Sequence, residues 1–74
     1  MEQRIIEIMK EVLESQDINE NSTQDTVENW TSLRQLNLAS ELEDEFDVEF
    51  DPSEIAEMKS VKQIASIIHE KMTS

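Results

Sequence analysis

The sequence predicts an all-α protein: a small four-helix bundle with three longer helices, one short helix and a long loop between the first and the second. Three observations carry this prediction. The chain has 74 residues, which is enough for one hydrophobic core, so we expect residues 1–74 to form a single domain. It contains no glycine, which excludes glycine-based hairpin turns. Several segments also repeat their apolar residues at helical spacing.

The first helix is expected over residues 2–14, where one apolar stripe recurs at helical spacing. The residues of this stripe are Ile5, Ile8, Met9, Val12 and Leu13. Residues 15–31 are mainly polar and predict a long loop, and a loop of that length in a small domain usually signals function. We expect its large apolar residues to pin it across the core; they are Ile18, Val27 and Trp30.

The second helix is expected from Ser32 to near Asp47, with one apolar arc and one polar face. The apolar arc comprises Leu36, Leu38, Ala39, Leu42 and Phe46. The polar face comprises Arg34, Asn37, Ser40, Glu41 and Asp44. Residues 46–50 alternate apolar and acidic side chains, which is also compatible with a short strand, although an isolated strand would have no partner.

Two capping patterns predict the remaining helices. Asp51 followed by Pro52 and Glu54 predicts the start of a short third helix. Ser60 with Gln63 has the form of a capping box and predicts the start of a fourth helix. The apolar faces together predict a core of Ile5, Met9, Val12, Leu36, Leu38, Leu42, Phe46, Ile55, Ile64 and Ile68.

Charge and composition argue against several classes of function. Eighteen acidic against six basic residues give a net charge of −12, which repels nucleic acid and anionic membrane surfaces. The absence of cysteine excludes disulfides and thiolate chemistry on the protein itself. The chain has no long apolar stretch and no signal-like start, so we expect a cytoplasmic protein without membrane insertion. A monomer is the default expectation.

The residues also offer no set for catalysis or metal binding. The single histidine, His69, falls in the last predicted helix, where we expect it to be solvated. The acids from Asp47 to Asp51 begin like an EF-hand loop, but Pro52 stands where that loop needs glycine and Met58 where it needs glutamate. We therefore expect neither an enzyme nor a metal site.

The junction of the long loop with the second helix carries the candidate site. Ser32 with Gln35 fits a capping box, and Thr31 is another suitable cap. The functional alternative is that Ser32 accepts a modification. A phosphodiester attached there would lie at the positive end of the helix dipole, beside free backbone N–H groups.

These residues resemble the signature of acyl carrier proteins. Ser32-Leu33 followed by the run from Glu43 to Phe46 is similar to the "D-S-L … L-E-E-E-F" pattern of that family. The segment from Asp47 to Pro52 and the order of the helices match the family over nearly the whole chain. Trp30, just ahead of the motif, is similar to the "W-D-S-L" run of specialised carriers.

The resemblance implies that Ser32 accepts 4′-phosphopantetheine from coenzyme A through a separate Mg-dependent phosphopantetheinyl transferase. The thiol of this arm would carry an acyl or related group as a thioester, so the protein would be a carrier and not an enzyme. Its partners would be acyl-loading and acyl-processing enzymes with basic patches, which the acidic helix attracts. The expected recognition residues are Thr31, Leu33, Arg34, Asn37, Glu41 and Asp44; Glu43 and Glu45 are expected to be merely solvated.

The sequence departs from the family pattern at five residues. Thr31 stands where an aspartate is usual, which predicts slower modification by standard transferases. Asn29 and Trp30 occupy the place of the usual glycine, so the loop is expected to differ locally. Arg34 and Asn37 replace acids of bulk fatty acid carriers, which suggests a dedicated pathway enzyme as partner. The alternatives are an unmodified interaction module and a peptidyl or aminoacyl carrier, although the net charge of −12 favours the acyl class.

Overall fold

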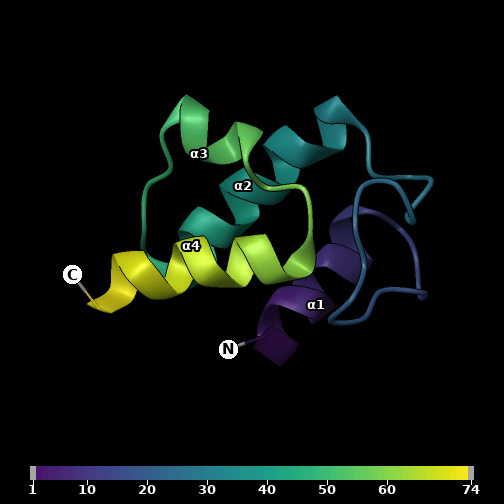
Figure 1. The fold of residues 1–74 in the computed structure, drawn as a ribbon, viewed down its shortest axis with the longest axis horizontal. Helices are drawn as coiled ribbons and strands as arrows, with labels where there is room; N and C mark the ends of the chain where they lie inside the picture. Colours follow the sequence, from purple (N-terminus) through teal and green to yellow (C-terminus); the bar gives the residue numbers. More distant parts are fainter. Residues whose placement is uncertain (1, 74) are drawn as a thin grey trace.

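A computed structural model describes residues 2–73 and contains four helices (Figure 1). The helices are α1 (Glu2–Val12), α2 (Ser32–Phe46), α3 (Pro52–Ala56) and α4 (Val61–Thr73). α1 packs against both α2 and α4, while α3 packs against α2. The predicted all-α fold is confirmed. The first helix ends two residues earlier than expected, and residues 48–51 form an irregular connection instead of a strand.

The core is drawn from all the long helices and from the segments beside α3. Its fully buried large side chains are Ile5, Met9, Leu13, Leu38, Leu42, Met58, Val61, Ile64 and Ile68. One predicted core residue is wrong: Leu36 is 58% exposed, because Gln35 takes the inward position of that helical turn. Val12, Phe46 and Ile55 are only partly buried and lie at the edge of the core. His69 is exposed, as expected.

The chain ends α1 and α2 without glycine. Asp47 adopts the left-handed conformation with φ 54°, and its N–H donates to the Glu43 carbonyl oxygen. Glu14, which follows α1, also has a positive φ of 51°, and its N–H donates to the Glu11 carbonyl oxygen at 3.3 Å. This conformation normally favours glycine or asparagine, and aspartate tolerates it better than most residues do. The predicted end of α2 near Asp47 is confirmed.

The long loop is docked more firmly than its polar composition suggests. Its apolar residues Ile18, Val27 and Trp30 are all buried, as predicted. The loop also forms an isolated antiparallel bridge between Thr23 and Ser60. In this bridge the Gln24 N–H donates to the Lys59 carbonyl oxygen at 2.9 Å. The start of α4 therefore fixes the middle of the loop.

The short helix α3 is held by one ion pair to the end of α4. The Asp51 N–H donates to the Glu54 carboxylate at 2.8 Å, which forms the start of the helix as predicted. Lys71 Nζ lies 2.8 Å from Glu54 Oε1 and 5.8 Å from the centre of the Phe50 ring. The Lys71 ammonium group, helped by the Asp51 N–H, lowers the pKa of Glu54, and Glu54 in turn raises the pKa of Lys71. These contacts fix α3 to the last turns of α4.

The ion pair predicts a pH dependence of stability. Because the folded-state pKa of Glu54 lies below its unfolded value, its stabilising contribution is complete above the unfolded pKa and is lost as the pH falls through the folded pKa. Native protein should therefore be more stable than Glu54→Gln by a margin that narrows on acidification. Urea unfolding between about pH 3 and about pH 7 measures this margin. Glu57→Gln, on an exposed neighbour, is the control; a margin independent of pH would contradict the prediction.

Candidate functional site

Ser32 is the first residue of α2, and its side chain is free. Thr31 is the N-cap, with extended backbone, and its Oγ1 accepts a hydrogen bond from the Arg34 N–H at 3.3 Å. Ser32 is exposed, and its hydroxyl makes no hydrogen bond to any side chain or backbone group in residues 2–73. The predicted Ser32 and Gln35 capping box is therefore wrong, and the alternative cap, Thr31, is confirmed. Ser32 therefore presents an exposed hydroxyl at a helix N-terminus.

The same S-x-x-Q pattern does form a cap at the start of α4. There the Gln63 N–H donates to Ser60 Oγ at 3.1 Å, and Ser60 precedes the helix. At α2 the serine of the pattern is itself the first helical residue, because Thr31, the residue before it, is the N-cap. Gln35 is then three residues before the buried Leu38 and faces inward with it. That spacing is the sequence signal that identifies Gln35 as an inward-facing residue.

Gln35 links three parts of the structure beneath Ser32. The side chain is only 7% exposed. Its Oε1 accepts hydrogen bonds from Trp30 Nε1 at 3.0 Å and from Gln24 Nε2, both in the long loop. Its Nε2 donates to the carbonyl oxygen of Ile55 in α3. Gln35, expected from the sequence only in a capping box with Ser32, instead joins the long loop, α2 and α3.

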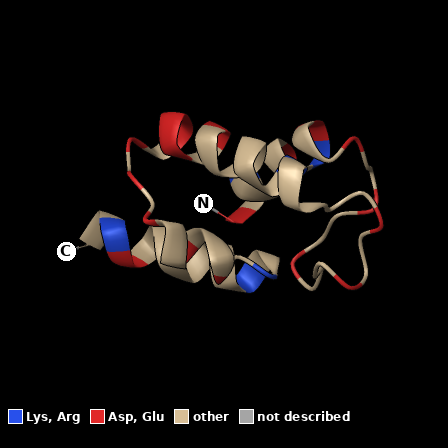
Figure 2. Cartoon of the chain, turned by 90° about the horizontal axis from the view of Figure 1, so that it is seen from above, with Lys and Arg blue, Asp and Glu red and all other residues tan. Residues whose placement is uncertain are grey.

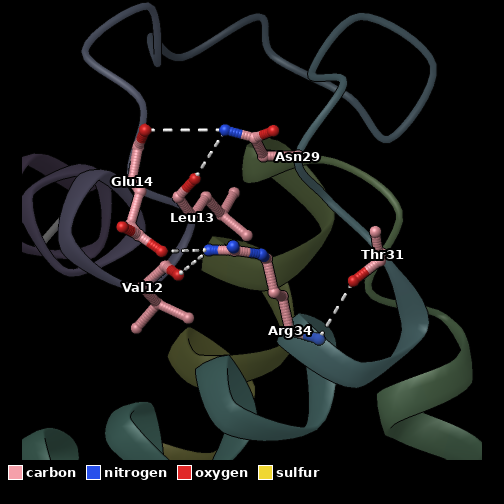
Figure 3. Close-up of polar contacts among 6 residues, drawn as sticks. All are labelled: Val12, Leu13, Glu14, Asn29, Thr31 and Arg34. Atoms are coloured by element: carbon pink, nitrogen blue, oxygen red, sulfur yellow. Dashed lines mark hydrogen bonds and ion pairs between the residues drawn. The ribbon is translucent and has the colours of Figure 1, made fainter.

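Arg34 faces α1, as Figure 3 shows. Its Nη1 donates to the Val12 carbonyl oxygen at 3.0 Å and lies 2.9 Å from Glu14 Oε2. Asn29 adds a hydrogen bond from its Nδ2 to the Leu13 carbonyl oxygen at 3.1 Å. Carbonyl groups at a helix C-terminus lack partners within the helix, and these two side chains supply them. The guanidinium predicted to meet partner enzymes therefore lies against the end of α1.

An open groove runs beside Ser32, between the first turn of α2 and α3. Its volume is about 370 Å³, and it is lined by Ser32 itself and by Gln24, Gln35, Leu36, Pro52, Ile55 and Ala56. Leu33, at 71% exposure, is a second large apolar side chain left on the surface next to the serine. Ser32 thus stands at the edge of a hollow that has both polar and apolar walls.

The acidic residues of α2 divide into two groups. Glu41 and Asp44 are exposed, as is Asn37 on the same helix. Glu43 instead accepts a hydrogen bond from the Phe50 N–H at 2.9 Å, and Glu45 lies 3.0 Å from Arg4 Nη2 of α1. The Arg4 guanidinium lowers the pKa of Glu45. Glu43 and Glu45, expected to be merely solvated, therefore make structural contacts.

The wider surface is acidic and holds few basic groups. Figure 2 shows acidic residues in red on the helices and on the connecting segments, with few basic residues in blue. Within residues 2–73, His, Cys, Asp and Glu side chains form no cluster of three or more suited to a metal ion. No helix in the same range has the length and apolar character needed to cross a membrane.

The site fits a phosphodiester-linked arm. A free serine hydroxyl has the chemistry to form a phosphodiester, and the positive end of α2 favours the negative charge of a phosphate. The groove and the exposed Leu33 and Leu36 offer surface along which such an arm could lie. A small helical domain that presents one free serine at the start of an acidic helix has the form of a carrier domain, which holds a group for other enzymes.

Comparison with known families agrees with this class. The family model described as "phosphopantetheine attachment site" matches residues 3–68. The chain therefore belongs to the family of phosphopantetheine-attachment domains, as the resemblance to acyl carrier proteins predicts. The cofactor of this family is covalently attached 4′-phosphopantetheine, and its members are generally non-catalytic carriers served by phosphopantetheinyl transferases and acyl-processing enzymes. Among curated proteins, no match to the chain is found.

Proposed function

We propose that this protein is an acyl carrier protein that bears 4′-phosphopantetheine on Ser32. It presents an acyl or related thioester to partner enzymes of a fatty acid, polyketide or other specialised acyl pathway. The observation that supports this proposal most directly is the free, exposed hydroxyl of Ser32 at the N-terminus of α2. The family model covers this position, since it spans residues 3–68.

In the modification step, Ser32 Oγ forms a bond to the pantetheine-side phosphorus of coenzyme A. The bond from that phosphorus to the bridging oxygen breaks, and adenosine 3′,5′-bisphosphate leaves with that oxygen. The proton of the serine hydroxyl passes to a general base. The attached arm supplies a thiol for acyl transfer. The N-terminus of α2 stabilises the resulting phosphodiester by about 0.3–1 kcal/mol at an exposed position. Thr31 contributes by fixing the start of the helix, and so the position of Ser32.

Partner enzymes would approach the exposed side of α2. Leu33, Asn37, Glu41 and Asp44 are all exposed there, beside or beyond Ser32. Carboxylates at such positions increase the rate of association with basic surfaces. Because salt screens these charges, the complexes also dissociate readily at physiological ionic strength. Arg34 contributes less to this surface, because it is bonded to the end of α1.

Intact mass after incubation with coenzyme A and a broad-specificity transferase tests the proposal. The native protein should gain one phosphopantetheine group, while Ser32→Ala should gain none because the accepting oxygen is gone. Ser40→Ala, on an exposed serine of the same helix, should gain one and serves as the matched control. Modification of Ser32→Ala, or none of the native protein, would overturn the assignment.

The same assay tests the replacement of the usual aspartate by Thr31. Aspartate caps a helix at least as well as threonine, so Thr31→Asp preserves the local fold. We expect Thr31→Asp to be modified faster than the native protein by a standard transferase. Equal initial rates would show that the missing carboxylate does not limit recognition.

A further inference from the structure

The groove beside Ser32 is separated from the core by the side chain of Gln35. The groove walls include Leu36 on α2 and Ile55 on α3, and Gln35 lies between them. Its amide joins the two helices through the Ile55 carbonyl oxygen and holds the Trp30 indole on the other side. Leu38, one turn further along α2, and Met58, after α3, are fully buried and do not line the groove. A chain that passed from the groove into the core would have to separate this amide from its partners.

A hydrocarbon chain offers nothing in exchange for those hydrogen bonds. Its entry would leave the Trp30 N–H, the Ile55 carbonyl and the Gln35 amide without partners in a buried place. Unsatisfied buried polar groups are strongly unfavourable, because they lose water without gaining another partner. A short acyl group, or one with hydrogen-bonding substituents, can instead remain in the groove, where Gln24 and Gln35 supply polar atoms. The bonded amide thus discriminates by length and polarity.

We infer that Gln35 is a specificity-determining residue that keeps long saturated acyl chains out of the helical core, so that this carrier holds short or polar acyl groups in the groove between α2 and α3. The inference rests on the proposed attachment of the arm to Ser32. Gln35 acts only through its hydrogen bonds to Trp30 and Ile55, and it takes no part in the loading reaction.

The test uses native protein to which the broad-specificity transferase has attached the acylated arm of butyryl-coenzyme A or dodecanoyl-coenzyme A. Intact mass verifies the loading. Trp30 is the only tryptophan, so its indole N–H gives one side-chain signal in a proton–nitrogen correlation spectrum. Because that N–H donates to Gln35, the signal reports directly on the bonded amide. We expect the indole signal and the melting temperature to be the same for the unacylated, butyryl and dodecanoyl forms.

Gln35→Met keeps the length of the side chain and removes its hydrogen bonds. In this variant the dodecanoyl form should melt about 4–8 °C or more above the unacylated form, since buried methylene groups then stabilise the fold. The butyryl form should gain much less. Ser40→Met introduces the same side chain at an exposed position of α2 and should behave like the native protein.

A dodecanoyl chain that shifts the Trp30 indole signal or raises the melting temperature of the native protein would overturn the inference. This native series is decisive even if Gln35→Met does not fold. An equal change in melting temperature on dodecanoylation of the native and Gln35→Met proteins would also overturn it. Failure to gain the arm at all, seen by mass, would overturn the proposed attachment to Ser32 as well, and so is distinct from these outcomes.

Discussion

Replacing Trp30 with alanine should lower the free energy of unfolding by about 3–5 kcal/mol, the usual effect of emptying a buried tryptophan site. Trp30 is 6% exposed and belongs to the same hydrophobic cluster as residues of all the long helices. Its indole also provides one of the bonds that hold Gln35. A domain of this size has a total stability of only about 5–10 kcal/mol, so the variant would be close to unfolding.

Urea unfolding followed by far-ultraviolet circular dichroism measures this effect, because the variant lacks the tryptophan used for fluorescence. Trp30→Phe is the control, since it retains most of the apolar volume and loses the N–H. We expect that variant to lose about 1–3 kcal/mol, the range for a partner left unsatisfied together with a modest loss of volume. If Trp30→Ala lost less than about 1 kcal/mol, the loop would not depend on this anchor.

Helical spacing and capping residues were sufficient to predict the fold. The apolar stripe of the first helix, Pro52 after Asp51, and Ser60 with Gln63 each lie where the structure begins or maintains a helix. These signals are local, since each depends on residues within a few positions of one another. The buried Trp30 in the long loop was also predictable, because a large apolar residue in a polar segment needs a place in the core.

The environment of Ser32 was harder to predict, because it depends on contacts between distant segments. The same S-x-x-Q pattern forms a cap at Ser60 but not at Ser32, and the difference arises from Thr31 and from the inward position of Gln35. The bridge between the long loop and the start of α4 is made by backbone groups, which leave no mark in the sequence. The serine itself was identified through its family motif and its place at a helix start.

Arg34 illustrates how such a contact changes a functional interpretation. From sequence, its positive charge among acids suggested a surface that selects a dedicated partner. In the structure its guanidinium bonds to the Val12 carbonyl oxygen and the Glu14 carboxylate, and the side chain is 33% exposed. A charged hydrogen bond to a helix C-terminus is stabilising, because it satisfies a free carbonyl and opposes the negative end of the dipole. We therefore propose that Asn37 and the exposed acids of α2 contribute more than Arg34 to selection among partners.

Arg34→Glu should accordingly lower the free energy of unfolding by about 2 kcal/mol, since it removes a charged hydrogen bond and places two carboxylates together at the end of α1. Asn37→Glu adds the same negative charge at an exposed position of α2 and should change stability by less than about 0.5 kcal/mol. Urea unfolding of both variants and of Glu14→Gln separates the contact from the charge. The interpretation of Arg34 as a partner-facing residue makes the opposite prediction: Arg34→Glu would keep its stability and improve loading by general acyl carrier enzymes. Loss of stability in Arg34→Glu alone would show that this arginine joins α1 to α2, and that the start of α2, where Ser32 lies, depends on it.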